Sequence, residues 1–344
     1  MLGGAVGDAL GAPVEFTSLA AIRRRFGAGG IRDYGPEYGR PGAITDDTQM
    51  AMFTAEGLIR AVVRYAGKGI CQPPSIVHHA YLRWLATQGE RPASGDVDMD
   101  GWLIEQRALW SRRAPGNTCL AALRSSSPGA PRADNDSKGC GGVMRVAPVG
   151  LLGEMGLPWL ADPFALGRAV AALTHGHPTG QFAAGFLALL ISEIVTGKPP
   201  DTAIDVAIAR LKKSDRHEET LAAVEGTRDL AAKGAASAER VETLGGGWVA
   251  EEALAIALYC ALVAESFEDG VVLAVNHGGD SDSTGSITGN ILGAWLGVDA
   301  IPERWLAPLE LRDAIARLAD DLYAARHDRL DRDSETIRER YPGW

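Results

Sequence analysis

The sequence predicts an all-α protein, a bundle of helices with little or no sheet. Apolar residues recur at the spacing i, i+3, i+4, i+7 in several segments, for example at Leu187, Leu190, Ile191 and Ile194. This spacing places them on one face of a helix. Alternating strand patterns are scarce, and the segment 30–34 is the one mild candidate for a strand. Because no heptad repeat persists, we expect a globular bundle and not a coiled coil.

The helices are expected where the apolar spacing returns. The segments are 50–65, 75–85, 187–194, 204–211, 254–262 and 311–322. Clusters of Gly and Pro at 27–42, 89–101, 125–142 and 245–247 separate them, since these residues favour turns. The adjacent His78 and His79 are expected on the surface of the second helix. The stretch 326–340 is dense in charges of both signs and is expected to be a solvated helix or a frayed tail.

Glycine recurs every fourth residue in two segments near opposite ends of the chain. The positions are 3, 7 and 11, and then 285, 289, 293 and 297. Each glycine costs a helix interior about 1 kcal/mol relative to alanine, so a compensating gain is expected. We predict that these two helices pack closely on or near each other, which would bring Asp8 and Glu15 towards Asp280 and Asp282.

Composition limits the partners of the protein. The 344 residues carry a formal net charge of −10, which argues against nucleic acid or an anionic membrane surface as the main partner. The sequence shows no uninterrupted apolar run of about 18 residues, so no membrane span is expected. The four cysteines show no metal-binding spacing and predict a reducing cytoplasm.

Two clusters of hard oxygen ligands lie far apart in the chain. One is Thr45-Asp46-Asp47, and the other is Gly278-Gly279-Asp280-Ser281-Asp282-Ser283. Taken alone, each cluster also suits an ordinary helix N-terminus or turn. Together they could hold two small divalent cations, because a hard ion such as Mg²⁺ prefers about six oxygen ligands. If the clusters meet, the chain folds as one domain and is a metal-dependent enzyme.

A glycine-rich loop at 135–145 is a candidate anion cradle. Three glycines free its backbone to approach a ligand, Lys138 and Arg145 add positive charge, and a helix is expected to follow. A plain glycine turn explains the same residues. Cys140 lies in this loop without an assignable base, so it is not interpreted as a nucleophile. His175 and His177, at 174–178, suit ligand contact or a capped loop better than a transition-metal site.

These motifs, in this order, resemble the ADP-ribosylglycohydrolase family, which includes the glycohydrolase that reactivates dinitrogenase reductase and the ADP-ribosylarginine hydrolases. The matching segments are Gly-Asp-Ala-Leu-Gly-x-x-x-Glu-Phe at 7–16, Thr-Asp-Asp-Thr at 45–48, Gly-x-Met-Arg-Val-Ala-Pro at 142–148, Thr-His-x-His-Pro at 174–178 and Gly-Gly-Asp-Ser-Asp-Ser at 278–283. The resemblance implies a single-domain orthogonal helical bundle over residues 1–325, with a binuclear metal site in a central cleft and a charged tail at 326–344.

The resemblance also implies roles for individual residues. The metal ligands would be Thr45, Asp46, Asp47, Asp280, Asp282 and Ser283, holding two Mg²⁺ ions, or Mn²⁺. Ser137, Lys138, Gly139, Cys140 and Gly141 match the loop that binds the pyrophosphate in relatives, and His175 matches a residue that contacts ADP-ribose. Glu15 matches an acidic residue that guards the metal site in some members. Ser283 replaces the threonine of many relatives, and Lys138 and Cys140 replace tyrosine and asparagine of some.

The resulting hypothesis is hydrolysis of the N-glycosidic bond between ADP-ribose and an arginine side chain. Asp46 or Asp282 would accept a proton from water, and Glu15 would act as an acid or a lid. The partner would then be an ADP-ribosylated protein or a small molecule that contains ADP-ribose. Two alternatives stay open: the same site acting on serine-linked, nucleobase-linked or O-acyl ADP-ribose, and a relative that binds ADP-ribose without turnover.

Overall fold

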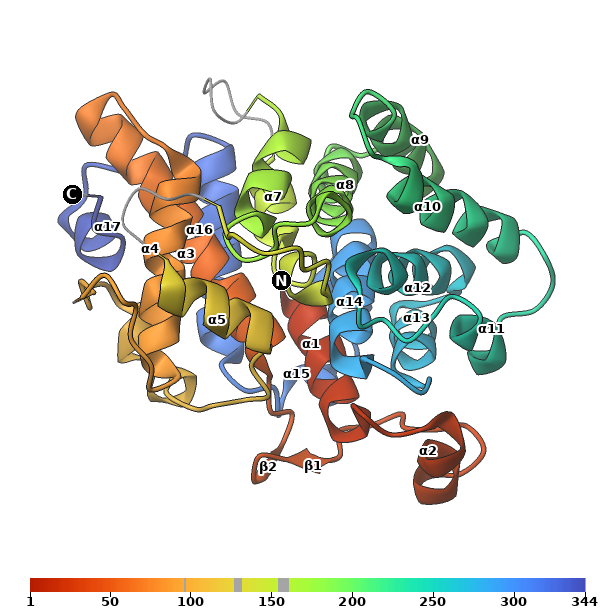
Figure 1. Ribbon diagram of the computed structural model, residues 1–344. Coiled ribbons are helices and arrows are strands. Elements are labelled where there is room, and N and C mark those ends of the chain that lie inside the picture. The colour runs from red at the N-terminus through yellow and green to blue at the C-terminus, as the bar shows by residue number, and fades with distance from the viewer. Residues whose placement is uncertain (96, 127–131, 154–160, 344) are drawn as a thin grey trace.

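The computed structural model describes residues 1–95, 97–126, 132–153 and 161–343. Within these ranges the chain is a bundle of α-helices with one small hairpin, as the sequence predicts (Figure 1). The helices are α1 Leu2–Gly11, α2 Leu19–Phe26, α3 Asp46–Lys68, α4 Pro73–Thr87, α5 Asn117–Ser125, α6 Ala147–Leu152, α7 Pro163–Ala171, α8 Pro178–Val195, α9 Pro200–Leu211, α10 Glu218–Ala231, α11 Ala238–Glu242, α12 Ala250–Val263, α13 Phe267–Val275, α14 Ser281–Leu296, α15 Glu303–Leu306, α16 Arg312–Arg326 and α17 Glu335–Arg340. The strands are β1 Pro36–Glu37 and β2 Arg40–Pro41, which pair antiparallel.

Helices α1 and α14 lie side by side at the centre of the bundle (Figure 1). Their backbones touch through the predicted glycines: a Cβ atom on Gly3 would lie 2.3 Å from the carbonyl oxygen of Gly289, and one on Gly7 would lie 2.0 Å from that of Gly285. Both distances are well inside van der Waals contact, so no side chain fits there. This close contact confirms the predicted packing and ties the first helix of the chain to one near its end.

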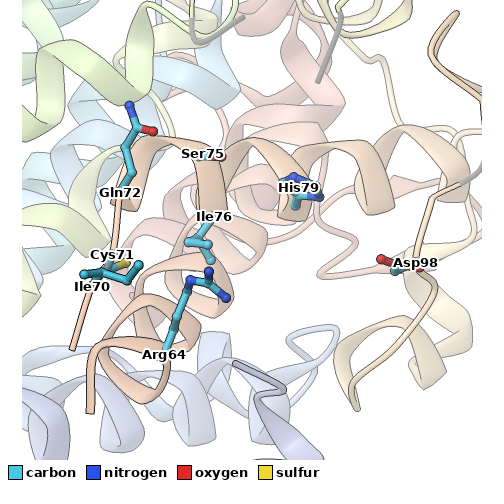
Figure 2. Close-up of a pocket in the computed structure, with 8 residues that line it drawn as sticks. All are labelled: Arg64, Ile70, Cys71, Gln72, Ser75, Ile76, His79 and Asp98. Carbon is cyan, nitrogen blue, oxygen red and sulfur yellow. The ribbon is translucent and has the colours of Figure 1, made fainter. Parts of the chain in front are cut away.

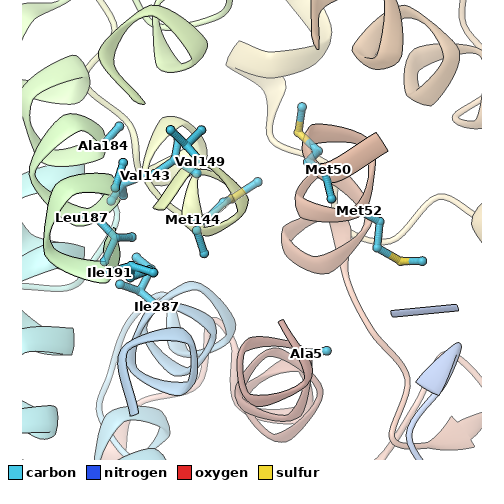
Figure 3. Packing of buried hydrophobic residues seen from close by; sticks show 14 of the residues in the cluster. Ala5, Met50, Met52, Val143, Met144, Val149, Ala184, Leu187, Ile191 and Ile287 are labelled. Atoms are coloured by element: carbon cyan, nitrogen blue, oxygen red, sulfur yellow. The ribbon is translucent and has the colours of Figure 1, made fainter. Parts of the chain in front are cut away.

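The remaining helices cover this central pair. In Figure 1, α3, α4 and α16 lie on one side of it, α12 and α13 lie on the other, and α8 lies above α14. One continuous apolar core runs through the bundle. Figure 3 shows Met50 of α3, Met144 just before α6, Leu187 of α8 and Ile287 of α14 gathered in this core. Burial of such side chains contributes roughly 1.5–3 kcal/mol each.

Two local expectations are wrong. The segment 30–34 forms no strand: the backbone of Ile31 is paired instead by the amide of Asn276, which accepts from Ile31 N at 2.8 Å and donates to Ile31 O at 2.9 Å. A distant side chain thus supplies the hydrogen bonds that a strand neighbour would give. His78 is buried, with 5% of its surface exposed, because α4 packs against α5 and α7 as well as against α3.

The segment after 325 is ordered against the bundle. None of the residues of α17 is buried, but the next residue, Tyr341, is fully buried and donates a hydrogen bond from its hydroxyl to Asp321 of α16 at 2.6 Å. One helix in the described ranges, α8, has the length and composition to cross a membrane, and 78% of it is buried inside the bundle. Its apolar surface is therefore used by the core.

Candidate metal centre and cleft

The two acidic clusters meet at the N-termini of α3 and α14. Thr45 is the N-cap of α3 and accepts from the N–H of Asp47, while Asp280 is the N-cap of α14. The hydroxyl of Ser283 donates to Asp47 Oδ2 at 3.3 Å, across 236 positions of sequence. Both helix N-termini carry partial positive charge, which favours carboxylates at this place.

Asp8 on α1 fixes the start of α3, a role that the sequence did not assign to it. Its carboxylate accepts from the N–H groups of Thr45 and Thr48 and from the Thr48 hydroxyl, with N···O distances of 3.0–3.1 Å. Since α1 is locked to α14 by the glycine contact, Asp8 connects the two cluster-bearing helices.

Six carboxylates lie close together here, with little positive charge to balance them. They are those of Asp8, Glu15, Asp46, Asp47, Asp280 and Asp282. Within the described ranges none of them has an ion-pair partner, and all but Glu15 are almost fully buried. Oxygen atoms of Glu15, Asp280 and Asp282 lie within 4.8 Å of one another. Oδ1 of Asp47 is buried and accepts no hydrogen bond.

Burial and mutual repulsion change the acidity of this cluster. Burial, followed by repulsion from Asp282, raises the pKa of Asp46 and of Asp47 well above the usual value. The same causes raise the pKa of Asp8 to about 7. For Glu15, burial and then Asp282 and Asp280 raise the pKa to about 10. Cations would relieve this repulsion, and the oxygen donors suit Mg²⁺ or Mn²⁺. The residues present therefore fit a divalent metal site.

The carboxylates lie at one end of a cleft of about 340 Å³. Its lining includes Glu15, Asp46, Asp47, Asp280, Asp282 and Ser283 from the acidic cluster, Gly116 and Thr118 at the start of α5, and Gly139, Cys140, Gly141 and His175 from the glycine loop and the histidine segment. At its mouth the ring of Phe16 stacks on that of Trp248, with centroids 5.1 Å apart. Phe16 is 74% exposed, and its φ of 61° is unusual for a residue other than glycine.

The glycine loop forms another wall of the cleft and is held in place by backbone hydrogen bonds. Cys140 N donates to Trp248 O at 3.1 Å, and Ala250 N donates to Lys138 O at 2.8 Å. The amide of Asn135 joins the loop to the histidine segment by accepting from Gly176 N and donating to Thr174 O. The predicted helix after the loop is α6, preceded by a 3-10 turn at Cys140–Gly142.

The two cations expected in this loop do not face the cleft. The ammonium of Lys138 forms ion pairs with Glu219 of α10 and Glu251 of α12. Arg145 is fully buried beneath the cleft wall. Ser137 also lies outside the lining, where its hydroxyl is paired with that of Thr118 at 3.2 Å. The positive charge predicted for the cradle is therefore directed elsewhere, and neutral groups form the wall.

The sulfur of Cys140 reaches across to the acidic side. Its thiol donates to Asp280 Oδ2 at 2.8 Å, and burial together with Asp280 and Asp47 raises its pKa well above the usual value. A thiol held protonated in this way is a poor nucleophile. This agrees with the sequence interpretation.

The segment before α5 completes the cleft, and the sequence did not single it out. Gly116 N donates to Asp46 Oδ2 at 3.1 Å, and Asn117, Thr118 and Cys119 of α5 line the same space. The first turn of α5 therefore opens into the cleft beside the carboxylates. The available signal was Gly116 before the helical run, since glycine is among the residues favoured at a helix N-cap.

A second hollow, of about 550 Å³, lies where α3 ends and α4 begins (Figure 2). Its lining includes Arg64, Cys71, Ser75, His79 and Asp98. None of the motif residues lies there, so the smaller cleft is the candidate active site.

The helical bundle places buried carboxylates beside one cleft, a set of oxygen donors that fits an enzyme active site with a divalent metal ion. A family model for ADP-ribosylglycohydrolase matches residues 1–331. The chain is 30% identical over 340 residues to an ADP-ribosyl-[dinitrogen reductase] glycohydrolase of Rhodospirillum rubrum, with 94% of each chain covered. It is 25% identical to the ADP-ribosylarginine hydrolase Tri1 of Serratia proteamaculans, covering 94% of this chain and 77% of that protein.

A solved structure supports the same assignment. The protein described as an ADP-ribosylglycohydrolase-related protein complex aligns with a TM-score of 0.69 and 31% identity, covering 94% of this chain and 95% of that one. The chain belongs to the ADP-ribosylglycohydrolase family. It is therefore a hydrolase of ADP-ribosyl linkages.

Proposed function

We propose that this protein removes ADP-ribose from arginine side chains of modified proteins, with two Mg²⁺ ions, or Mn²⁺, held in the cleft. The observation that carries the proposal is the meeting of Asp46 and Asp47 with Asp280 and Asp282 in one buried cluster. The arginine linkage is supported by the name of a relative, ADP-ribosylarginine hydrolase.

The ligands would be Thr45, Asp46, Asp47, Asp280, Asp282 and Ser283. Bound ions would polarise the ribose hydroxyls and activate a water molecule. Their binding would also offset the repulsion that now raises the carboxylate pKa values.

Different side chains would carry out the two proton transfers, one from the attacking water and one to the leaving guanidine. Asp46 or Asp282 accepts a proton from the water that attacks the anomeric carbon. The C–N bond to the guanidine breaks, and the neighbouring carboxylates stabilise the positive charge that develops on the sugar. Glu15, at the mouth of the cleft, donates a proton to the departing guanidine or closes over it. The products are ADP-ribose and unmodified arginine.

The wall formed by the glycine loop would hold the remainder of ADP-ribose. Gly139, Cys140, Gly141 and His175 line it, and the glycines leave room for a phosphate to approach the backbone closely. Lys138 is assigned to support of the loop because its ammonium is held by two ion pairs. Ser137 is assigned the same role because its hydroxyl pairs with that of Thr118, outside the cleft lining.

The test is mass spectrometry of a protein ADP-ribosylated on arginine, incubated with the enzyme with and without Mg²⁺. We expect loss of the modification and release of free ADP-ribose only with the metal. Substrates with serine, nucleobase and O-acyl linkages form the comparison panel. Faster release from one of these would reassign the linkage, and tight binding of ADP-ribose without any release would contradict hydrolysis.

A further inference from the structure

Arg145 is a buried cation whose position the proposed reaction does not explain. Its side chain is fully buried, and within the described ranges it has no carboxylate partner. Its guanidinium lies 4.4 Å from the ring centre of Tyr81 and donates to Cys119 Sγ at 3.3 Å. Burying an unpaired charge is costly. A function of Arg145 that offsets this free-energy cost is therefore expected.

The shortest hydrogen bond of Arg145 connects it to His175 through the hydroxyl of Thr174. Nη2 of Arg145 donates to Thr174 Oγ1 at 2.6 Å, and the same oxygen lies 2.8 Å from His175 Nδ1. A guanidinium can only donate, so the Thr174 oxygen uses a lone pair to accept this bond. Its own proton remains available. The nearby Cys119 sulfur is a weak acceptor, whereas Nδ1 of a neutral imidazole is a good one.

The hydroxyl proton of Thr174 therefore goes to Nδ1, which leaves the ring proton of His175 on Nε2. That nitrogen faces the glycine wall of the cleft. A Cβ atom on Gly139 would lie 3.3 Å from Nε2, and one on Gly141 would lie 3.1 Å from the adjacent ring carbon Cε1. The bare backbone of these two glycines thus makes room for the ring and leaves its N–H edge beside the cleft.

We propose that Arg145 and Thr174 are positioning residues which fix His175 as the neutral Nε2–H tautomer, a hydrogen-bond donor to the phosphate or ribose oxygens of ADP-ribose. The role in binding rests on the proposed function, whereas the tautomer does not. A neutral N–H donor can bind an oxygen of the ligand without placing a further charge in a cleft that already contains several carboxylates. A histidine free to titrate would change its charge and donor pattern with pH.

The acidity of His175 agrees with this arrangement. Burial, and then the charge of Arg145, lowers the pKa of His175 to about 3. The ring therefore stays neutral throughout the range in which the protein is expected to work. Arg145 contributes in two ways, by orienting Thr174 and by opposing a second positive charge.

Nuclear magnetic resonance of the full-length protein, labelled with ¹⁵N in its histidine rings, tests the tautomer directly. His175→Gln identifies the signal by its loss. We expect Nδ1 of His175 to show the shift of an unprotonated nitrogen and Nε2 that of an N–H, unchanged between pH 5 and 8. A protonated Nδ1, or titration within this range, would overturn the proposal.

Two variants test the positioning residues. In Thr174→Val the donor to Nδ1 is lost, and in Arg145→Met the Thr174 hydroxyl is free to turn and accept from Nδ1. Both should show a mixture of tautomers, while Thr174→Ser should keep the Nε2–H form. If Thr174→Val fails to fold, the wild-type spectrum and Arg145→Met still decide the question. An unchanged Nε2–H form in Arg145→Met would remove Arg145 from the proposal.

Calorimetry with free ADP-ribose and Mg²⁺ tests whether the Nε2–H tautomer of His175 contributes to ligand affinity. We expect Thr174→Val to raise Kd at least about twofold, because a mixture of tautomers leaves only about half of the molecules in the binding form, and Thr174→Ser to keep the wild-type Kd. Equal affinity in wild type and Thr174→Val would overturn the role in binding. Absence of ADP-ribose binding by the wild type would instead contradict the proposed function, with the spectroscopic result unaffected.

Discussion

The two walls of the cleft differ in charge: one carries buried carboxylates, and the other is lined by neutral groups. On one wall, Asp46, Asp47, Asp280 and Asp282 are held at the N-termini of α3 and α14, and none of them forms an ion pair within the described ranges. On the other wall the nearby cations, Lys138 and Arg145, are directed away from the cleft, and glycine residues and a neutral histidine line it. Under the proposed function, affinity for an anionic ligand would come from neutral donors and from bound metal ions.

This contrast makes the acidic wall the more sensitive to substitution. We expect Asp282→Ala to lower the rate of ADP-ribose release about a thousandfold, because a ligand and a candidate base are lost together. Release assays with Mg²⁺ measure the effect, and circular dichroism checks the fold. Asp333→Ala is the control, since that carboxylate is exposed. Equal loss in both variants would show that the effect is not local.

The neutral wall should respond to added volume. A Cβ atom at Gly141 would lie 2.8 Å from Cys119 Sγ and 3.1 Å from the ring of His175. We therefore expect Gly141→Ala to displace this ring and to weaken ADP-ribose binding about tenfold, a loss of about 1.4 kcal/mol. Calorimetry would measure it. Unchanged affinity would mean that this wall does not contact the ligand.

The acidic wall should also set how stability depends on pH. The pKa of Asp8 rises to about 7 and that of Glu15 to about 10 on folding. The folded state therefore binds more protons than the unfolded state between about pH 4 and these values. Stability of the metal-free protein should then fall as pH rises from about 4 to above 7.

Thermal unfolding at several pH values, with a chelator or with Mg²⁺, would measure this dependence. With Mg²⁺ the fall should be smaller, because the ions stabilise the ionised carboxylates. If the stability of the metal-free protein rose over the same range, burial and mutual repulsion would not be raising the pKa values of these carboxyl groups.

The smallest effect is expected at Lys138. Its ammonium pairs with Glu219 and Glu251, and its side chain is partly exposed, so Lys138→Met should change stability by less than about 1 kcal/mol. Affinity for ADP-ribose should change less than about twofold, in contrast to Gly141→Ala. A loss as large as tenfold would show that Lys138 turns to the ligand when it binds.

Much of this arrangement could be predicted from the sequence. Glycines at every fourth position predicted the contact of α1 with α14, because only a missing side chain explains such a costly repeat. That contact, with the family motifs, predicted that the acidic clusters would meet. The residue types also predicted hard oxygen ligands.

The direction of single side chains was not predictable. The sequence of the loop at 135–145 shows that Lys138 and Arg145 are charged. It does not show their interaction partners, which lie elsewhere in the chain. Glu219 and Glu251 lie 81 and 113 positions after Lys138. Likewise, the strand expected at 30–34 is replaced by hydrogen bonds from Asn276, 245 positions away from Ile31. Local patterns specify which groups are present, and packing decides where they point.

The central claim is that the acidic wall is a binding site for two metal ions. Titration of the metal-free protein with Mn²⁺, with free ion followed by electron paramagnetic resonance, counts them directly. We expect two Mn²⁺ ions for each wild-type chain and loss of at least one in Asp282→Ala. A wild-type protein that binds no Mn²⁺, or an Asp282→Ala variant that binds as many ions as the wild type, would contradict the claim.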